Sequence, residues 1–183
     1  MRLAAGGVFA SLIGSGRAQA FESLTSWSGA QPPSFTLEDT DRRATSLADY
    51  RGRPLILHFF ATWCEPCLRE LPALGALLGR HQAAGLTVLA VSVSEPDIRV
   101  RRFLERSPVP FPVLLDRDRA VSKAWGADVL PTSILLDRSL IARHGVQGEF
   151  DWSGSAADEA VAALAAHPAT PHNEAQTTQG GKG

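Results

Sequence analysis

The apolar segment Leu55–Phe60 (LILHFF) constrains the fold of this chain more than any other part of the sequence. Gly52 and Pro54 bound it on the N-terminal side, and almost no polar residue interrupts it. A six-residue run without polar alternation is typical of a strand buried on both faces, as in a parallel sheet between layers of helices. We therefore expect an α/β domain with this strand in its interior.

Strand and helix patterns alternate along the rest of the chain. After a hairpin over 35–37 and 43–45, we expect strands over 55–60, 86–93, 113–115, 134–136 and 141–146. We expect helices over 66–80, 94–106, 119–125 and 155–167, with Ser94 and Ser155 as N-terminal caps. This alternation indicates a largely parallel sheet with a late antiparallel pair. The prediction is a central mixed sheet flanked by helices, with an N-terminal β-hairpin and a central β/α insertion.

The first twenty residues have the pattern of an export signal. Arg2 precedes an apolar stretch, and Ala18-Gln19-Ala20 is a small-x-small sequence that signal peptidases cleave. The stretch is much shorter than the roughly 20 residues that span a bilayer, which favours cleavage over an uncleaved membrane anchor. We expect a signal peptide over 1–20, the domain over 21–167 and a disordered tail over 168–183. The mature protein would then work in the periplasm or another extracytoplasmic compartment, where disulfides persist.

Composition excludes several classes of function. Eighteen Lys and Arg residues against nineteen Asp and Glu residues leave a formal charge of -1, so we expect no nucleic-acid partner. The two cysteines are too few for a disulfide framework and half of a four-Cys zinc site. A site of two Cys and two His also fails, because no second His follows His81 at the required spacing. We expect no metal and no cofactor other than a redox-active disulfide.

Cys64-Glu65-Pro66-Cys67 lies at the junction between the buried strand and the helix after it. A cysteine at a helix N-terminus forms a more stable thiolate, because unpaired backbone N–H groups and the positive end of the helix dipole face it. Cys64 is therefore the candidate nucleophile. Cys67 follows one helical turn later, within reach of a mixed disulfide on Cys64. Pro66 suits the start of a helix, where its missing N–H has no partner to lose.

The segment FFATWCEPCLRELP over 59–72 resembles the active segment of thioredoxin-like reductases of the TlpA and ResA type, in the AhpC/TSA-redoxin superfamily. The resemblance covers about residues 32–165 and includes Leu130-Pro131-Thr132 before a strand. It implies a thioredoxin-like fold in which Pro131 is cis and faces the cysteines. Leu130 would then expose its backbone to an extended substrate that pairs with it as an added strand.

Three neighbours of the cysteines complete the predicted site. Trp63 is expected to pack against the rim of the active site. Glu65 either raises the energy of the Cys64 thiolate, which makes a stronger reductant, or merely complements the helix N-terminus. His58 stands six residues before Cys64, where the resemblance predicts a buried Asp or Asn. It either moves protons for Cys67 near neutral pH or is a structural residue bonded to a backbone carbonyl.

These features predict a secreted thiol-disulfide oxidoreductase that acts as a reductant. Cys64 would attack a protein disulfide, and Cys67 would release the product and close a Cys64-Cys67 disulfide. The resemblance implies apocytochrome c or a copper-site protein as substrate, in cytochrome c or copper-site assembly. It also implies a membrane electron donor that restores the dithiol, and we expect a monomer.

Two alternatives stay open. Thiol peroxidases of the same superfamily usually have a Thr three residues before the nucleophile, whereas Thr62 lies two before Cys64. A copper metallochaperone would bind through both thiolates and a His such as His144. Metallochaperones of this fold usually have Cys-x-x-x-Cys, and the spacing here is shorter.

Overall fold

The computed structural model describes residues 22–28 and 30–168, in which eight strands form one mixed sheet. The strands are β1 (Thr25–Ser26), β2 (Thr36–Asp39), β3 (Ala44–Ser46), β4 (Leu55–Phe60), β5 (Thr87–Val93), β6 (Val113–Asp116), β7 (Thr132–Leu136) and β8 (Ala142–Gln147). The helices are α1 (Glu65–Arg80), α2 (Asp97–Arg106), α3 (Ala120–Ala124) and α4 (Ser155–Ala166), with 3-10 turns over Leu47–Tyr50 and Gln82–Ala84. The predicted signal peptide and residues 169–183 of the predicted tail lie outside the described residues.

Strand β4 is an interior strand, as its apolar sequence predicts. The sheet order is β1-β8-β7-β4-β5-β6-β2-β3, with β4 parallel to β5 and antiparallel to β7. All six residues of β4 are buried. The pair β7 and β8 is the expected late antiparallel pair. Helix α2 and strand β6 lie between β5 and α3 in the chain and form the central β/α insertion. The predicted α/β architecture is therefore confirmed.

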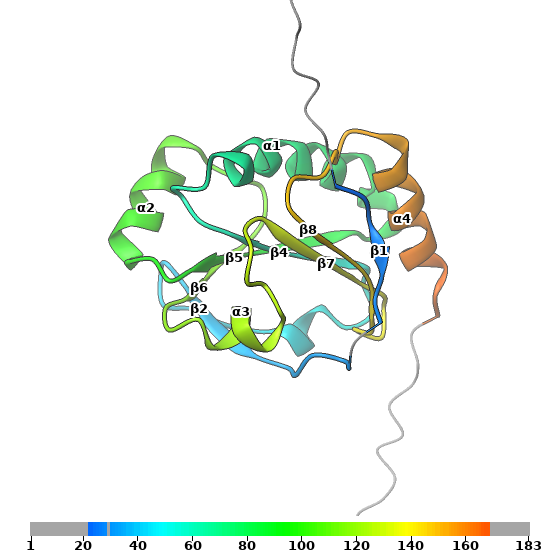
Figure 1. The fold of residues 1–183 in the computed structure, drawn as a ribbon, viewed down its shortest axis with the longest axis horizontal. Helices are drawn as coiled ribbons and strands as arrows, with labels where there is room; N and C mark the ends of the chain where they lie inside the picture. Colours follow the sequence, from blue (N-terminus) through cyan, green and yellow to red (C-terminus); the bar gives the residue numbers. More distant parts are fainter. Residues whose placement is uncertain (1–21, 29, 169–183) are drawn as a thin grey trace, which may run out of the picture.

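Helices cover both faces of the sheet (Figure 1). Helices α1, α2 and α4 lie over one face, while α3 and the 3-10 turn Leu47–Tyr50 lie over the other. Side chains along β4 alternate between these layers, because successive residues of a strand point to opposite faces. Ile56 and Phe60 pack in the core under α1, and Leu57 and Phe59 pack in the core with Trp125. By the same alternation His58 faces α1.

Three local details differ from the sequence prediction. Strand β1 lies within a segment for which only an extended lead-in is predicted, and it pairs with β8 through Ser26 and His144. Helix α2 has Pro96, not Ser94, as its N-cap, because the fixed φ of proline suits the extended cap position. Helix α4 has Gly154 as its N-cap, and Ser155 is already its first helical residue. Both predicted serine caps are therefore wrong.

The packing of α1 on the sheet predicts which substitutions lower the free energy of unfolding. Leu74 is fully buried between α1 and the sheet, so Leu74→Ala removes buried methyl groups and leaves a cavity. We expect the free energy of unfolding to fall by about 2–5 kcal/mol, measured by urea denaturation. Ile98→Ala on the exposed face of α2 is the control and should change it by less than about 0.5 kcal/mol. Equal effects of the two substitutions would contradict the observed packing.

Candidate active site

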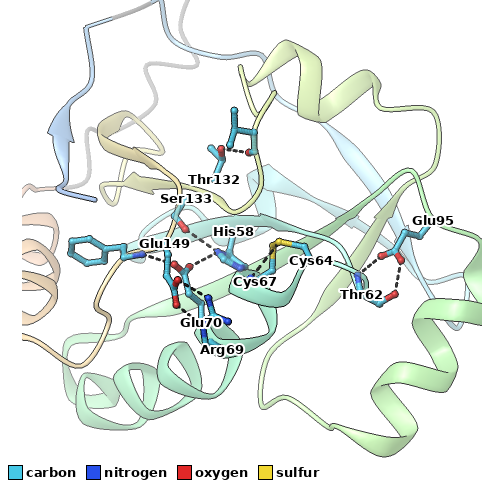
Figure 2. The surroundings of a disulfide bond; sticks show 12 residues. His58, Thr62, Cys64, Cys67, Arg69, Glu70, Glu95, Thr132, Ser133 and Glu149 are labelled. Carbon is cyan, nitrogen blue, oxygen red and sulfur yellow. Dashed lines mark hydrogen bonds and ion pairs between the residues drawn. A yellow bond between two sulfur atoms is a disulfide. The ribbon is translucent and has the colours of Figure 1, made fainter. Parts of the chain in front are cut away.

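Cys64 and Cys67 form a disulfide at the point where the chain leaves β4 and enters α1 (Figure 2). Their Cα atoms are 5.3 Å apart. Cys64 is the N-cap of α1, and its Sγ accepts the backbone N–H of Cys67 at 3.4 Å. Pro66 lies in the first turn, where no backbone N–H is required. The sulfur of Cys64 therefore lies where a helix N-terminus favours negative charge.

The two cysteines differ in their access to solvent. Cys64 is 6% exposed, whereas Cys67 is completely buried beneath the first turn of α1. A partner molecule can approach only the Cys64 side of the disulfide without rearrangement of the helix. This arrangement supports the order of attack that the sequence predicts, with Cys64 as the outer cysteine and Cys67 as the inner one.

The loop before β7 contributes a second wall of the site. The Leu130–Pro131 peptide bond is cis, as the family resemblance implies. The carbonyl of Pro131 accepts the N–H of Gly148 at 2.8 Å, and the hydroxyl of Thr132 donates to the carbonyl of Val129 at 2.6 Å. In the part of the chain that the structure describes, no hydrogen bond uses the backbone N–H or C=O of Leu130. That backbone is therefore available to a ligand.

A pocket lies between the segment before Cys64 and the loop before β7. Trp63, predicted to pack on the rim, is 65% exposed and forms one wall of this pocket. Leu130, from the loop before β7, also lines it. The remaining lining residues come from the end of β5 and from the region around α3: Val93, Ser94, Arg119, Ala127 and Asp128. The pocket joins two predicted site residues that lie far apart in the sequence.

A buried polar network lies beneath α1. Glu70 follows Cys67 by three residues, so both side chains are on the buried face of the helix. Its carboxylate accepts the N–H of Phe150 at 2.6 Å and the indole N–H of Trp152 at 2.8 Å. His58 lies below it, with Nδ1 3.7 Å from Oε2 of Glu70 and 2.8 Å from Oγ of Ser133. His58 and Ser133 are cross-strand neighbours on β4 and β7.

Burial shifts both titratable groups of this network. It lowers the pKa of His58 to about 3, because a charged imidazole would lose its hydration. It raises the pKa of Glu70 to about 7, although the hydrogen bonds from Phe150 and Trp152 favour the carboxylate and partly oppose the shift. Glu70, not His58, is therefore the group that titrates near neutral pH.

Glu70 is a buried residue of the site that the sequence prediction does not include. The pattern of leucines places it off the apolar face of α1, yet it is buried. The spacing of three residues from Cys67 was the available signal, because residues three apart on a helix share a face. The donors that make burial tolerable, Phe150 and Trp152, lie about 80 positions away, and no local pattern predicts them.

Glu65 lies on the surface beside the disulfide. Its side chain is 87% exposed, and its carboxylate lies 3.2 Å from the guanidinium of Arg69. Arg69 also donates two hydrogen bonds of 2.8 Å to the carboxylate of Glu149, which lowers the pKa of Glu149. The charge of Glu65 is therefore partly balanced by Arg69 and partly screened by solvent.

A mixed sheet covered by helices on both faces, whose central strand leads into a helix with the Cys64-Cys67 disulfide at its N-terminus, is the arrangement of the thioredoxin-like fold. Comparison with known proteins agrees with this class. Residues 28–144 match the AhpC/TSA family, and the chain belongs to that family.

Named relatives are oxidoreductases. The thiol-disulfide oxidoreductase ResA of Geobacillus thermodenitrificans (strain NG80-2) is 41% identical over 111 residues, which cover 61% of this chain and 64% of that protein. ResA of Bacillus subtilis (strain 168) is 38% identical over 109 residues, which cover 60% of this chain and 61% of that protein. The chain thus spans less than two thirds of the length of these relatives.

A solved structure confirms the predicted thioredoxin-like fold. The secreted thiol-disulfide isomerase of Corynebacterium glutamicum superposes with a TM-score of 0.70 at 22% identity, covering 88% of this chain and 100% of that one. Within residues 22–28 and 30–168, no helix has the length and apolar character needed to cross a membrane.

The raised pKa of Glu70 predicts how stability depends on pH. A carboxyl whose pKa rises on folding binds its proton more tightly in the folded chain. The stabilisation of the folded protein by this tighter proton binding is therefore fully present below pH 4.5, the pKa of Glu70 in the unfolded chain. It is lost as pH rises through about 7, the pKa of Glu70 in the folded protein. Relative to Glu70→Gln, which does not titrate, the oxidised protein should lose on the order of 1–3 kcal/mol between pH 5 and pH 8.

Urea denaturation of both proteins at the two pH values measures this loss. The opposite pH dependence of His58, whose stabilisation is lost as pH falls from 6.5 toward 3, is common to both and cancels in the comparison. Parallel pH dependences of the two proteins would show that Glu70 does not titrate in this range.

Proposed function

We propose that this chain is an extracytoplasmic thiol-disulfide oxidoreductase that reduces protein disulfides. The observation that carries the proposal is the Cys64-Cys67 pair at the N-terminus of α1, with an outer and an inner cysteine beside an unpaired Leu130 backbone. Similarity to the ResA oxidoreductases supports it. The export pattern of the first twenty residues supports an extracytoplasmic location, whether that segment is cleaved or retained as an anchor.

The reaction starts from the reduced protein. The Cys64 thiolate attacks one sulfur of the substrate disulfide, forms a mixed disulfide and releases the first substrate sulfur as a thiolate. Cys67 then loses its proton and attacks Cys64, which forms the Cys64-Cys67 bond and releases the second substrate thiolate. Two electrons pass from the cysteine pair to the substrate, and protons from the two cysteine thiols balance the two product thiols.

The inner cysteine needs a proton acceptor, because it is sealed from water. Glu70 lies one helical turn from Cys67, and its pKa of about 7 suits the exchange of a proton near neutral pH. His58 is neutral there, since burial holds its pKa near 3. In this mechanism Glu70 accepts the proton of Cys67, and His58 with Ser133 completes the polar surroundings of Glu70.

Substrate binding follows from the free backbone at Leu130. An extended segment that carries the substrate cysteine would pair with this backbone as an added strand and place its neighbouring side chains in the pocket beside Trp63. Apocytochrome c or a copper-site protein is the proposed substrate class, on the family resemblance. A membrane donor would return two electrons and two protons to the disulfide, and the working unit would be a monomer.

Two observations weigh against the alternative functions. The hydroxyl of Thr62 donates to Oε1 of Glu95 at 2.5 Å, so it is not directed at the Cys64 sulfur as a peroxidase threonine would be. In the described part of the chain, no three His, Cys, Asp or Glu side chains are grouped so that they could hold a metal ion.

Trapping tests the proposed reaction. Cys67→Ser should stall at the mixed disulfide, because the inner thiol that resolves it is missing. Incubation of this reduced variant with insulin should give a covalent adduct on Cys64, detected by non-reducing electrophoresis and mass spectrometry. The wild type should reduce insulin in repeated turnovers with dithiothreitol, and Cys64→Ser should do neither. No adduct in the Cys67→Ser variant would overturn the proposal.

His58→Asn tests the polar surroundings of Glu70. The shorter amide cannot replace both contacts of the imidazole, so the Glu70 carboxylate becomes harder to form. We expect the pH profile of insulin reduction to move to higher pH, with Ser133→Ala moving it less. An unchanged profile in His58→Asn would assign His58 a purely structural role.

A further inference from the structure

A buried carboxylate joins the segment before Cys64 to the end of β5 (Figure 2). Glu95 is only 5% exposed. Its Oε2 accepts the backbone N–H of Thr62 at 2.8 Å and the hydroxyl of Ser92 at 2.8 Å. Its Oε1 accepts the hydroxyl of Thr62 at 2.5 Å. Three donors from two separate segments thus converge on one side chain.

Burial of this carboxylate needs compensation. A charged group removed from water is costly unless hydrogen bonds replace its hydration. Among the described residues, Glu95 forms no ion pair, so its hydrogen bonds to neutral donors supply that compensation. Hydrogen bonds to an ionised acceptor are about twice as strong as neutral ones. The three hydrogen bonds therefore fix the backbone and the side chain of Thr62 against the end of β5.

The chain path explains why Glu95 reaches Thr62. Ser94 has a φ of 57°, in the left-handed region that non-glycine residues rarely adopt. This conformation turns the chain sharply after β5 and directs Glu95 back toward the segment between β4 and α1. A strained residue persists where its surroundings hold it, and the hydrogen bonds of Glu95 hold this one.

The contacts of Glu95 join two of the segments that line the pocket beside Cys64. Trp63 forms one wall and follows Thr62 directly, while Val93 and Ser94 form another and lie between Ser92 and Glu95. Cys64 is two residues beyond Thr62. Any movement of Thr62 therefore moves both the nucleophile and the pocket wall.

We propose that Glu95 is a positioning residue that, through Thr62, sets the place of the Cys64 sulfur at the N-terminus of α1 and the spacing of the pocket walls. The pocket part of this inference rests on the proposed function. The part that concerns Cys64 does not, because the acidity of its thiol can be measured without any protein substrate.

Geometry and charge can be separated at this position. Glu95→Gln can keep all three contacts: its carbonyl oxygen accepts from Thr62 N–H and Ser92, and its NH₂ donates to the Thr62 hydroxyl, which can also accept. Glu95→Ala removes every contact. Thr62→Val removes one hydrogen bond and retains the carboxylate. Asp137→Ala is the control, because Asp137 is a buried carboxylate beyond the opposite end of β7. It accepts the N–H groups of Ser139 and Ile141 and also pairs with Arg143 at 2.6 Å.

The experiment measures the thiolate absorbance of Cys64 against pH in the Cys67→Ser background, and insulin reduction in chains with both cysteines. In Glu95→Ala the thiolate should form at higher pH, because the sulfur leaves the helix N-terminus. The kcat/KM for insulin should fall by about 10-fold or more, since a misplacement of about 1 Å can cost about 100-fold. Glu95→Gln should retain wild-type kcat/KM, and Thr62→Val should shift both readouts less than Glu95→Ala.

The control and the conservative variant decide the outcome. Asp137→Ala should lower stability without a change in Cys64 titration. The inference is overturned if Cys64 titrates alike in Glu95→Ala and the wild type, or if Glu95→Gln loses as much kcat/KM as Glu95→Ala. If Glu95→Ala does not fold, the titration of Thr62→Val decides instead, and an unchanged titration overturns the inference. Failure of the wild type to reduce insulin would instead overturn the proposed function and leave the titration result standing.

Discussion

The burial of β4 on both faces is the constraint on which the rest of the structure depends. At the carboxyl end of β4 the chain leaves the sheet, and after a short connection it enters α1. The junction supplies unpaired N–H groups at the N-terminus of a helix, and Cys64 occupies that place. Because the strand is held by β5 and β7 and the helix by the core beneath it, the sulfur atoms lie on rigid elements. Rigid support of this kind is what a reactive group requires.

The site combines an apolar shell with a few polar groups that are almost completely satisfied. Glu70 and Glu95 are both buried carboxylates near the cysteines, but their surroundings differ. Glu70 accepts one hydrogen bond on each oxygen, from Phe150 and from Trp152, and burial nevertheless raises its pKa to about 7. Glu95 accepts three hydrogen bonds, two of them from the backbone and hydroxyl of Thr62, the residue two before Cys64. The first arrangement suits a group that exchanges a proton, and the second suits a group that holds a backbone in place.

The local spacing of apolar residues predicted most of the fold, because this spacing depends directly on which side chains are buried. The apolar run of β4 and the spacing of leucines in α1 each reflect the neighbours that cover them, so their bounds agree with the sequence to within a residue. Such spacing does not predict contacts between residues that lie far apart in the sequence. Glu70 is buried only because Phe150 and Trp152 lie beside it, and Glu95 only because Thr62 does. The two serine caps were predicted from the hydroxyl that a serine can offer to the first turn of a helix. In the structure Pro96 and Gly154 occupy the cap positions and provide only the extended backbone.

The short strands at the two ends of the sheet have a consequence for solubility. Strand β1 has two residues and β3 has three, so within the described residues neither outer edge offers a long row of free backbone groups. Long exposed edges pair with other chains and promote aggregation. With both edges blunt, an extended chain would pair with the free backbone at Leu130 rather than with an edge of the sheet.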